Sequence, residues 1–97
     1  MPLKIFWSKR AIKSYMRVAD FILEGWTVRE VKNFADKTSN IILKIAINPE
    51  MFVSSVQKNI RKGKITRQTS MFYRIEADSI QLLHFWDNRK NPKKLKH

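Results

Sequence analysis

The chain has 97 residues, of which 20 are lysine or arginine and 8 are aspartate or glutamate, so its formal net charge is +12 at pH 7. This length suits a single domain over residues 1–97. The absence of cysteine excludes disulfides and thiolate metal sites. His84 and His97 lack metal-ligand spacing, so we expect no metal and no other cofactor. With no apolar run long enough for a membrane span and no apolar signal-peptide core near residue 1, we expect a cytoplasmic protein that does not contact membranes.

The positive charge is concentrated in the second half of the chain. Residues 51–97 carry eleven cations and three carboxylates, a net charge of +8. Such a field attracts polyanions, so we expect RNA, DNA, the ribosome or an acidic protein as the partner. A basic protein whose charges are merely spread over its surface remains the alternative.

The first half predicts a strand followed by a helix hairpin. Residues 3–7 are mostly apolar and predict a short strand, and Ser8 is a candidate N-cap. A helix is expected from Lys9 to about Glu24, ended by Gly25. Residues 27–30 read Thr-Val-Arg-Glu, a capping box, and open a second helix that runs to about Ile47. The short connection requires the two helices to lie antiparallel.

The second half predicts three strands. Strands are expected over residues 56–62, 65–75 and 80–86, with turns at 62–64 and 77–79 and a basic, mobile tail from about residue 90. In the last strand, alternation places His84 on the same face as Ile80, Leu82 and Trp86. The predicted fold is therefore α+β, with the helix hairpin packed on one face of a small, largely antiparallel sheet.

Several short motifs in this order resemble a known family. They are Trp7-Ser8 before the first helix, Asn48-Pro49 after the second, Ile60-Arg61-Lys62 on the next strand, and Phe-Trp-Asp-Asn-Arg-Lys-Asn-Pro over residues 85–92. Together they cover nearly the whole chain and are similar to the RelE/ParE superfamily of type II toxins, found in addiction and plasmid-stabilisation modules. This resemblance implies a β-α-α-β-β-β fold.

The resemblance also implies a toxin that is held inactive by an acidic antitoxin encoded beside it. Members similar to RelE are ribosome-dependent mRNA interferases, whereas members similar to ParE bind DNA gyrase and are not enzymes. We expect the first activity and keep the second as an alternative. A member that has lost its toxicity, or a basic nucleic-acid-binding module without toxicity, also remains open.

The candidate catalytic residues are Arg61, Arg89 and His84. Arginines would stabilise developing phosphate charge, and a histidine has a pKa suited to proton transfer. In the nuclease members, the resemblance places a further arginine at the position of Ser70 and a tyrosine near Leu95, and both are missing here. His84 could instead be a residue that flanks the core, and Arg89 could pair with Asp87.

A cluster of cations predicts a nucleic-acid-binding surface. Its members on the second and third strands and in the tail are Lys58, Arg61, Lys62, Lys64, Arg67, Lys93 and Lys94. The alternative is an edge strand that uses lysines to prevent aggregation. For the antitoxin, the resemblance implies exposed apolar surface on the helix hairpin or along a sheet edge. Val18, Phe21, Val28 and Leu43 are candidates, although each could instead widen the buried face of its helix.

Overall fold

The computed structural model describes residues 2–54 and 59–88. Its elements follow the predicted order and are β1 (Lys4–Trp7), α1 (Lys9–Gly25), α2 (Val28–Ile47), β2 (Ile60–Lys64), β3 (Thr69–Ile75) and β4 (Ser79–Asp87). The strands form a four-stranded sheet in the order β1-β4-β3-β2. The β1–β4 pair is parallel, and the β4–β3 and β3–β2 pairs are antiparallel. The predicted α+β fold is confirmed.

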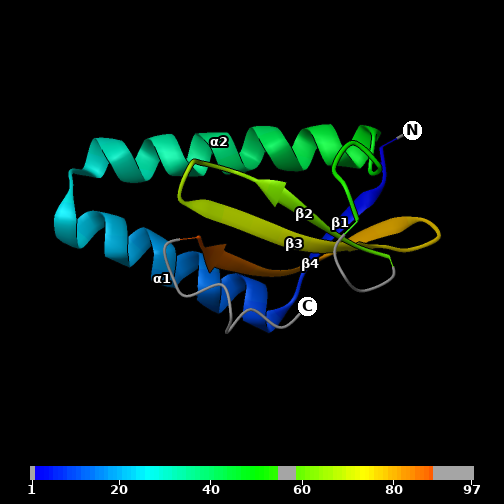
Figure 1. Cartoon of the computed structure of the whole chain (residues 1–97), viewed down its shortest axis with the longest axis horizontal. Coiled ribbons are helices and arrows are strands. Elements are labelled where there is room, and N and C mark those ends of the chain that lie inside the picture. Colours follow the sequence, from blue (N-terminus) through cyan, green and yellow to red (C-terminus); the bar gives the residue numbers. More distant parts are fainter. Residues whose placement is uncertain (1, 55–58, 89–97) are drawn as a thin grey trace.

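Both helices pack against the same face of the sheet. Their buried side chains, such as Ala11, Phe34 and Ile45, join Met71 and Tyr73 of β3 in one core cluster. In Figure 1, the tip of the helix hairpin and the turn between β2 and β3 lie at the same end of the molecule. The end of β4 lies there too, beside α1.

Ser8 joins the start of α1 to β4. Its hydroxyl oxygen accepts the amide hydrogen of Ala11 at 2.9 Å, which is the N-cap bond that the sequence predicts. The same hydroxyl donates to the carbonyl oxygen of Leu83 at 3.0 Å. Farther along α1, the Ser14 hydroxyl accepts the amide hydrogen of Phe85 at 2.8 Å. The two serine hydroxyls thus provide hydrogen-bond partners for backbone groups of β4 in the part of the strand that is not paired with β1.

The predicted capping box at the start of α2 is wrong. Thr27 is the N-cap residue, but its side chain makes no capping hydrogen bond. The amide of Glu30, which the threonine hydroxyl would have capped, donates to the backbone carbonyl of Thr27 at 3.0 Å instead. Since that amide already has a partner, the hydroxyl is not needed there.

The predicted turn at residues 62–64 is also wrong, because Gly63 lies inside β2. The chain turns at residues 65–68, where the Thr66 hydroxyl accepts the amide hydrogens of Gln68 and Thr69 at 3.2 and 3.1 Å. Gly63 serves a packing purpose, since a Cβ atom at this position would lie 2.9 Å from the ring of Phe52. The predicted strand over residues 56–62 begins at Ile60, and residues 55–58 lie outside the described residues.

A β-bulge changes which way the side chains of β4 point. Phe72 is paired with His84 and Tyr73 with Leu82, so Leu83 has no partner of its own in the register. Ile80, Leu82 and Phe85 therefore all belong to the helix-side core. The strict alternation expected over residues 80–86 is wrong, and His84 lies on the face opposite Ile80 and Leu82.

Within the described residues, no helix is long and apolar enough to cross a membrane.

Candidate functional site

The strands present a second face that points away from the helices, which we call the outer sheet face. It is identified by alternation with the helix-side core residues and by the strand register. Its members are Lys4, Phe6, Ile60, Lys62, Lys64, Ser70, Phe72, Arg74, Ser79, Gln81, His84 and Trp86. None of these strand residues is acidic.

Two cross-strand rows on this face combine lysines with aromatic side chains. In the first row, Lys62 is paired with Phe72, which is paired with His84. The rings of Phe72 and His84 stack with centroids 4.7 Å apart, and both residues are 2% exposed. The lysine at the end of this row is exposed to solvent.

The second row is Lys64–Ser70–Trp86, directly beside the first. Ser70, which occupies the position where the resemblance implies an arginine, is buried, and its hydroxyl donates to Oδ1 of Asn88 at 3.1 Å. Lys64 is exposed. The two rows thus place two exposed ammonium groups on the same face as a histidine and a tryptophan.

Arg61 lies on the other side of β2. Its register partner is Tyr73 of the helix-side core, and its Nη1 donates to the backbone carbonyl of Phe52. This bond ties the segment after α2 to the sheet, together with the bond from the amide of Lys62 to the carbonyl of Val53 at 3.4 Å. The structure therefore separates Arg61 from the lysines that follow it.

Tyr73 also helps to hold the segment after α2 against the sheet. Its hydroxyl donates to the backbone carbonyl of Pro49 at 2.7 Å. Burial raises the pKa of Tyr73 to about 12, against the opposing effects of the Arg61 charge and of the backbone of Phe52. Tyr73 is neutral at physiological pH and acts here as a hydrogen-bond donor.

A hollow of about 920 Å³ opens beneath the tip of the helix hairpin. We call it the hairpin groove; α1, α2, residues 66–69 and the end of β4 over 84–87 line it. Its floor is apolar and is formed by Val18, Phe21, Ile22, Phe34 and Phe85. Because β4 borders it, the groove reaches the edge of the sheet at His84 and Trp86, which also belong to the outer sheet face.

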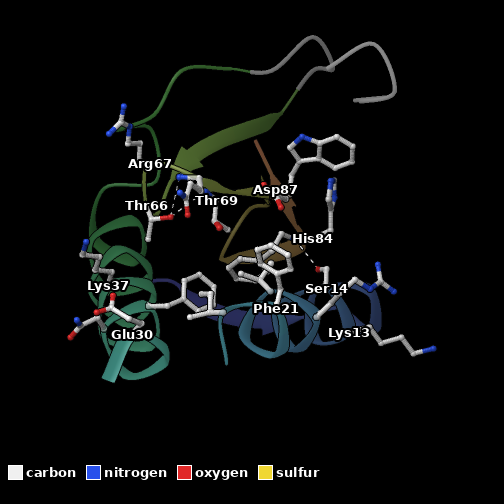
Figure 2. Close-up of a pocket in the computed structure, with 18 of the residues that line it drawn as sticks. Lys13, Ser14, Phe21, Glu30, Lys37, Thr66, Arg67, Thr69, His84 and Asp87 are labelled. Atoms are coloured by element: carbon white, nitrogen blue, oxygen red, sulfur yellow. Dashed lines mark hydrogen bonds between the residues drawn. The ribbon is translucent and has the colours of Figure 1, made fainter. Parts of the chain in front are cut away.

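The rim of the hairpin groove is strongly basic. The cations that line it, within the part of the chain that is described, are Lys9, Arg10, Lys13, Arg17, Lys37 and Arg67, against the carboxylates Glu30 and Asp87. Figure 2 shows Lys13 on one side of the hollow and Lys37 and Arg67 on the other. An apolar floor between cations on both sides suits an acidic, amphipathic occupant.

The structure thus distributes the predicted site residues over several places. His84, Lys62 and Lys64 share the outer sheet face, Arg61 lies on the helix side, and Arg67 lines the hairpin groove. Val18 and Phe21 also line the groove, whereas Val28 and Leu43 are exposed elsewhere. Lys58, Arg89, Lys93 and Lys94 lie outside the described residues.

Sequence reasoning missed the groove and the partnership of Phe72 with His84. The groove depends on how far the helix hairpin extends past the sheet, and the partnership depends on the bulge at Leu83. Neither leaves a local sequence signal. In residues 2–54 and 59–88, no group of three or more His, Cys, Asp or Glu side chains is placed to hold a metal ion.

Known structures share this arrangement of helices and strands. A chain of the chromosomal ParDE toxin–antitoxin system from P. aeruginosa superposes with a TM-score of 0.75 at 14% identity, over 88% of this chain and 95% of that one. A copper-bound mutant toxin from Helicobacter pylori gives 0.64 at 18% identity, over 88% and 93%. The YoeB dimer from Staphylococcus aureus gives 0.62 at 14% identity, over 87% and 94%.

No model of a known protein family matches the sequence. No curated protein sequence matches it either. The likeness is therefore one of structure, and the chain shares the fold of these solved toxin and toxin–antitoxin chains.

Proposed function

We propose that this protein is the toxin of a type II toxin–antitoxin module and that it cleaves mRNA on the ribosome. The observation that carries the proposal is the pair of rows Lys62–Phe72–His84 and Lys64–Ser70–Trp86 on the outer sheet face. They bring exposed cations, a histidine and aromatic rings to one surface without a carboxylate among its described strand residues. A surface of this kind suits a single-stranded polyanion.

The proposed chemistry is attack of a ribose 2′-hydroxyl on the adjacent phosphorus, with departure of the 5′-oxygen. The ammonium groups of Lys62 and Lys64 stabilise the negative charge that develops on the phosphate oxygens. His84 takes up or delivers a proton at the reacting oxygens. Because His84 is 2% exposed, its ring must become accessible for this step, whereas both lysines already face solvent.

The antitoxin is proposed to occupy the hairpin groove. The groove offers an apolar floor at Val18 and Phe21 and a rim of cations, which complement an acidic amphipathic helix. Since His84 and Trp86 of β4 line the groove, an antitoxin bound there lies next to the proposed catalytic histidine. Binding would then inhibit the toxin by covering the approach to His84.

The test is expression in growing cells, followed by mapping of the 5′ ends of cellular mRNA. The native chain is expected to stop growth and to produce new ends at codon positions, while Lys62→Glu/Lys64→Glu removes both effects. The double variant Arg29→Glu/Lys44→Glu makes the same change in net charge at exposed positions on α2 and is expected to behave as the native chain. Equal loss of both effects in the two variants would contradict the proposal.

The second candidate function is inhibition of DNA gyrase without catalysis. The ParDE chain has the higher TM-score, 0.75 against 0.62 for YoeB, and the bond of Arg61 to the carbonyl of Phe52 removes a candidate catalytic arginine from the outer sheet face. A supercoiling assay with purified gyrase separates the two functions. Inhibition of supercoiling together with intact mRNA would favour this candidate over the first.

A further inference from the structure

A third cross-strand row on the outer sheet face has a composition different from the other two. Phe6 of β1 is paired with Gln81 of β4, which is paired with Arg74 of β3. We propose that this row is a subsite for one nucleotide of single-stranded RNA, whose base stacks on the Phe6 ring. The inference rests on the proposed RNA substrate and adds the residues that would hold a nucleotide next to the reacting one.

The register places the three side chains close together. Neighbouring strands lie about 4.7–4.9 Å apart, so the row that crosses β1, β4 and β3 spans roughly 10 Å. These residues point away from the helices because their neighbours Ile5, Ile80, Leu82 and Tyr73 belong to the helix-side core or pack on it. One base with its ribose and phosphate has comparable dimensions.

The exposure of the row fits a binding role. Phe6 is 48% exposed, and Arg74 is exposed as well. An aromatic ring left in water on a sheet provides a flat surface on which any base can stack. The Gln81 amide both donates and accepts hydrogen bonds at a base edge, and the Arg74 guanidinium can bind a phosphate through two of its N–H groups.

The position of the row relative to the lysines supports RNA over a protein partner. Arg74 lies two residues from Phe72 along β3, on the same face, so the third row lies about 7 Å from the Lys62–Phe72–His84 row. The exposed cations Lys4, Lys62, Lys64 and Arg74 accompany the three rows. The described carboxylates nearest to the rows are Glu76 and Asp78, in the turn after β3, and Asp87, at the end of β4. The exposed cations therefore complement the phosphates of an RNA strand that crosses several rows.

The experiment measures binding of a short, fluorescently labelled single-stranded RNA to the purified full chain by anisotropy. Phe6→Leu keeps the apolar character and removes the ring, and it is expected to weaken binding about 5- to 100-fold, in line with the loss of one base stack. Phe6→Trp keeps a ring and is expected to bind as the native chain does. Arg74→Ala is expected to lower the slope of log affinity against log salt by about one unit.

Leu23→Ala is the control, because Leu23 is also about half exposed, at 51%, but lies on α1 and is not among the residues that line the hairpin groove. It is expected to leave RNA binding unchanged. Native affinity in Phe6→Leu, with tight RNA binding by the native chain, would overturn the subsite and leave the proposed function standing. Absence of RNA binding by the native chain would overturn the subsite, whereas the proposed function is decided by the mapping of mRNA ends. Loss of antitoxin binding but not of RNA binding in Phe6→Leu would make the row a protein interface and overturn the subsite.

Discussion

The imidazole of His84 stacks on the phenyl ring of Phe72 across the β3–β4 register, with centroids 4.7 Å and planes 15° apart. This pairing exists because the bulge at Leu83 turns His84 away from the helix-side core. Without the extra residue, the histidine would share a face with Leu82 and point into the core. The bulge thus brings the candidate proton-transfer group to the face that carries Lys62.

His84→Gln tests that role directly. The amide is close in size to imidazole but does not titrate near neutral pH, so the rate of mRNA cleavage is expected to fall about 10²- to 10⁴-fold. Affinity for RNA is expected to change little, because the exposed lysines remain. Single-turnover rates on programmed ribosomes and anisotropy with labelled RNA measure the two quantities. A native cleavage rate in this variant would exclude His84 from the chemistry.

Arg61→Ala is expected to lower the free energy of unfolding. The variant loses a hydrogen bond from a charged donor to the Phe52 carbonyl, which contributes about 1.5–3 kcal/mol. Lys62→Ala, at the next position but exposed and on the opposite face, is expected to change stability by less than about 0.5 kcal/mol. Urea denaturation of both variants measures the difference. Equal stabilities would mean that Arg61 does not fasten the segment after α2.

A loss of stability in Arg61→Ala would change how a loss of toxicity in any Arg61 variant is interpreted. A variant that combines Arg61→Ala with Arg89→Ala is expected to reduce toxicity partly by destabilising the protein. Lys62 and Lys64 are the cleaner positions for testing charge at the proposed RNA surface, because both side chains are exposed to solvent.

The two helix N-caps provide a matched pair of threonine and serine variants. Ser8→Ala removes the bond to the Ala11 amide and the bond to the Leu83 carbonyl, so the unfolding free energy is expected to fall by about 1–2 kcal/mol. Thr27→Ala removes a side chain that makes no capping bond and is expected to cost under about 0.5 kcal/mol. Thermal melts monitored by circular dichroism measure both changes. A larger loss in Thr27→Ala would contradict the described caps.

Tyr73 makes stability depend on pH in the alkaline range. Burial raises its pKa to about 12 in the folded chain, above the value near 10 of an exposed tyrosine. The folded state then holds the proton more tightly, so this contribution to stability is complete below pH 10 and is lost as pH rises from about 10 to 12. Tyr73→Phe is expected to be less stable at pH 7, because it loses the bond to Pro49, but to lose less stability over that alkaline range. Urea denaturation at pH 7, 10 and 11.5 tests this; parallel losses in the two proteins would contradict it.

The sequence predicts the elements well where local chemistry decides. Ser8 caps the start of α1, Asn48-Pro49 ends α2, and the alternation of Met71, Tyr73 and Ile75 with Phe72 and Arg74 correctly assigns the two faces of β3. Gly25 marks the end of α1 only approximately, because it is the last residue of the helix and Trp26 is the C-cap. The order of elements and the fold class follow from these signals together with the family resemblance. Periodicity is informative here because each of these segments buries one regular stripe.

The site is less predictable because it depends on contacts between distant segments. Gly63 suggests a turn by composition, but the ring of Phe52 occupies the place of its side chain and keeps it inside β2. Arg61 looks like a surface cation until the segment after α2 supplies a carbonyl for it. Phe6 and Arg74 are far apart in sequence, and only the register of β1 and β3 on β4 brings them into one row.

The central claim is tested most directly by adding the purified protein to a cell-free translation reaction and mapping mRNA 5′ ends by primer extension. The account predicts cuts at codon positions that require ribosomes, that disappear in Lys62→Glu/Lys64→Glu and that persist in Arg29→Glu/Lys44→Glu. Intact mRNA and normal translation, from a folded protein that stops growth in cells, would contradict mRNA cleavage at the outer sheet face.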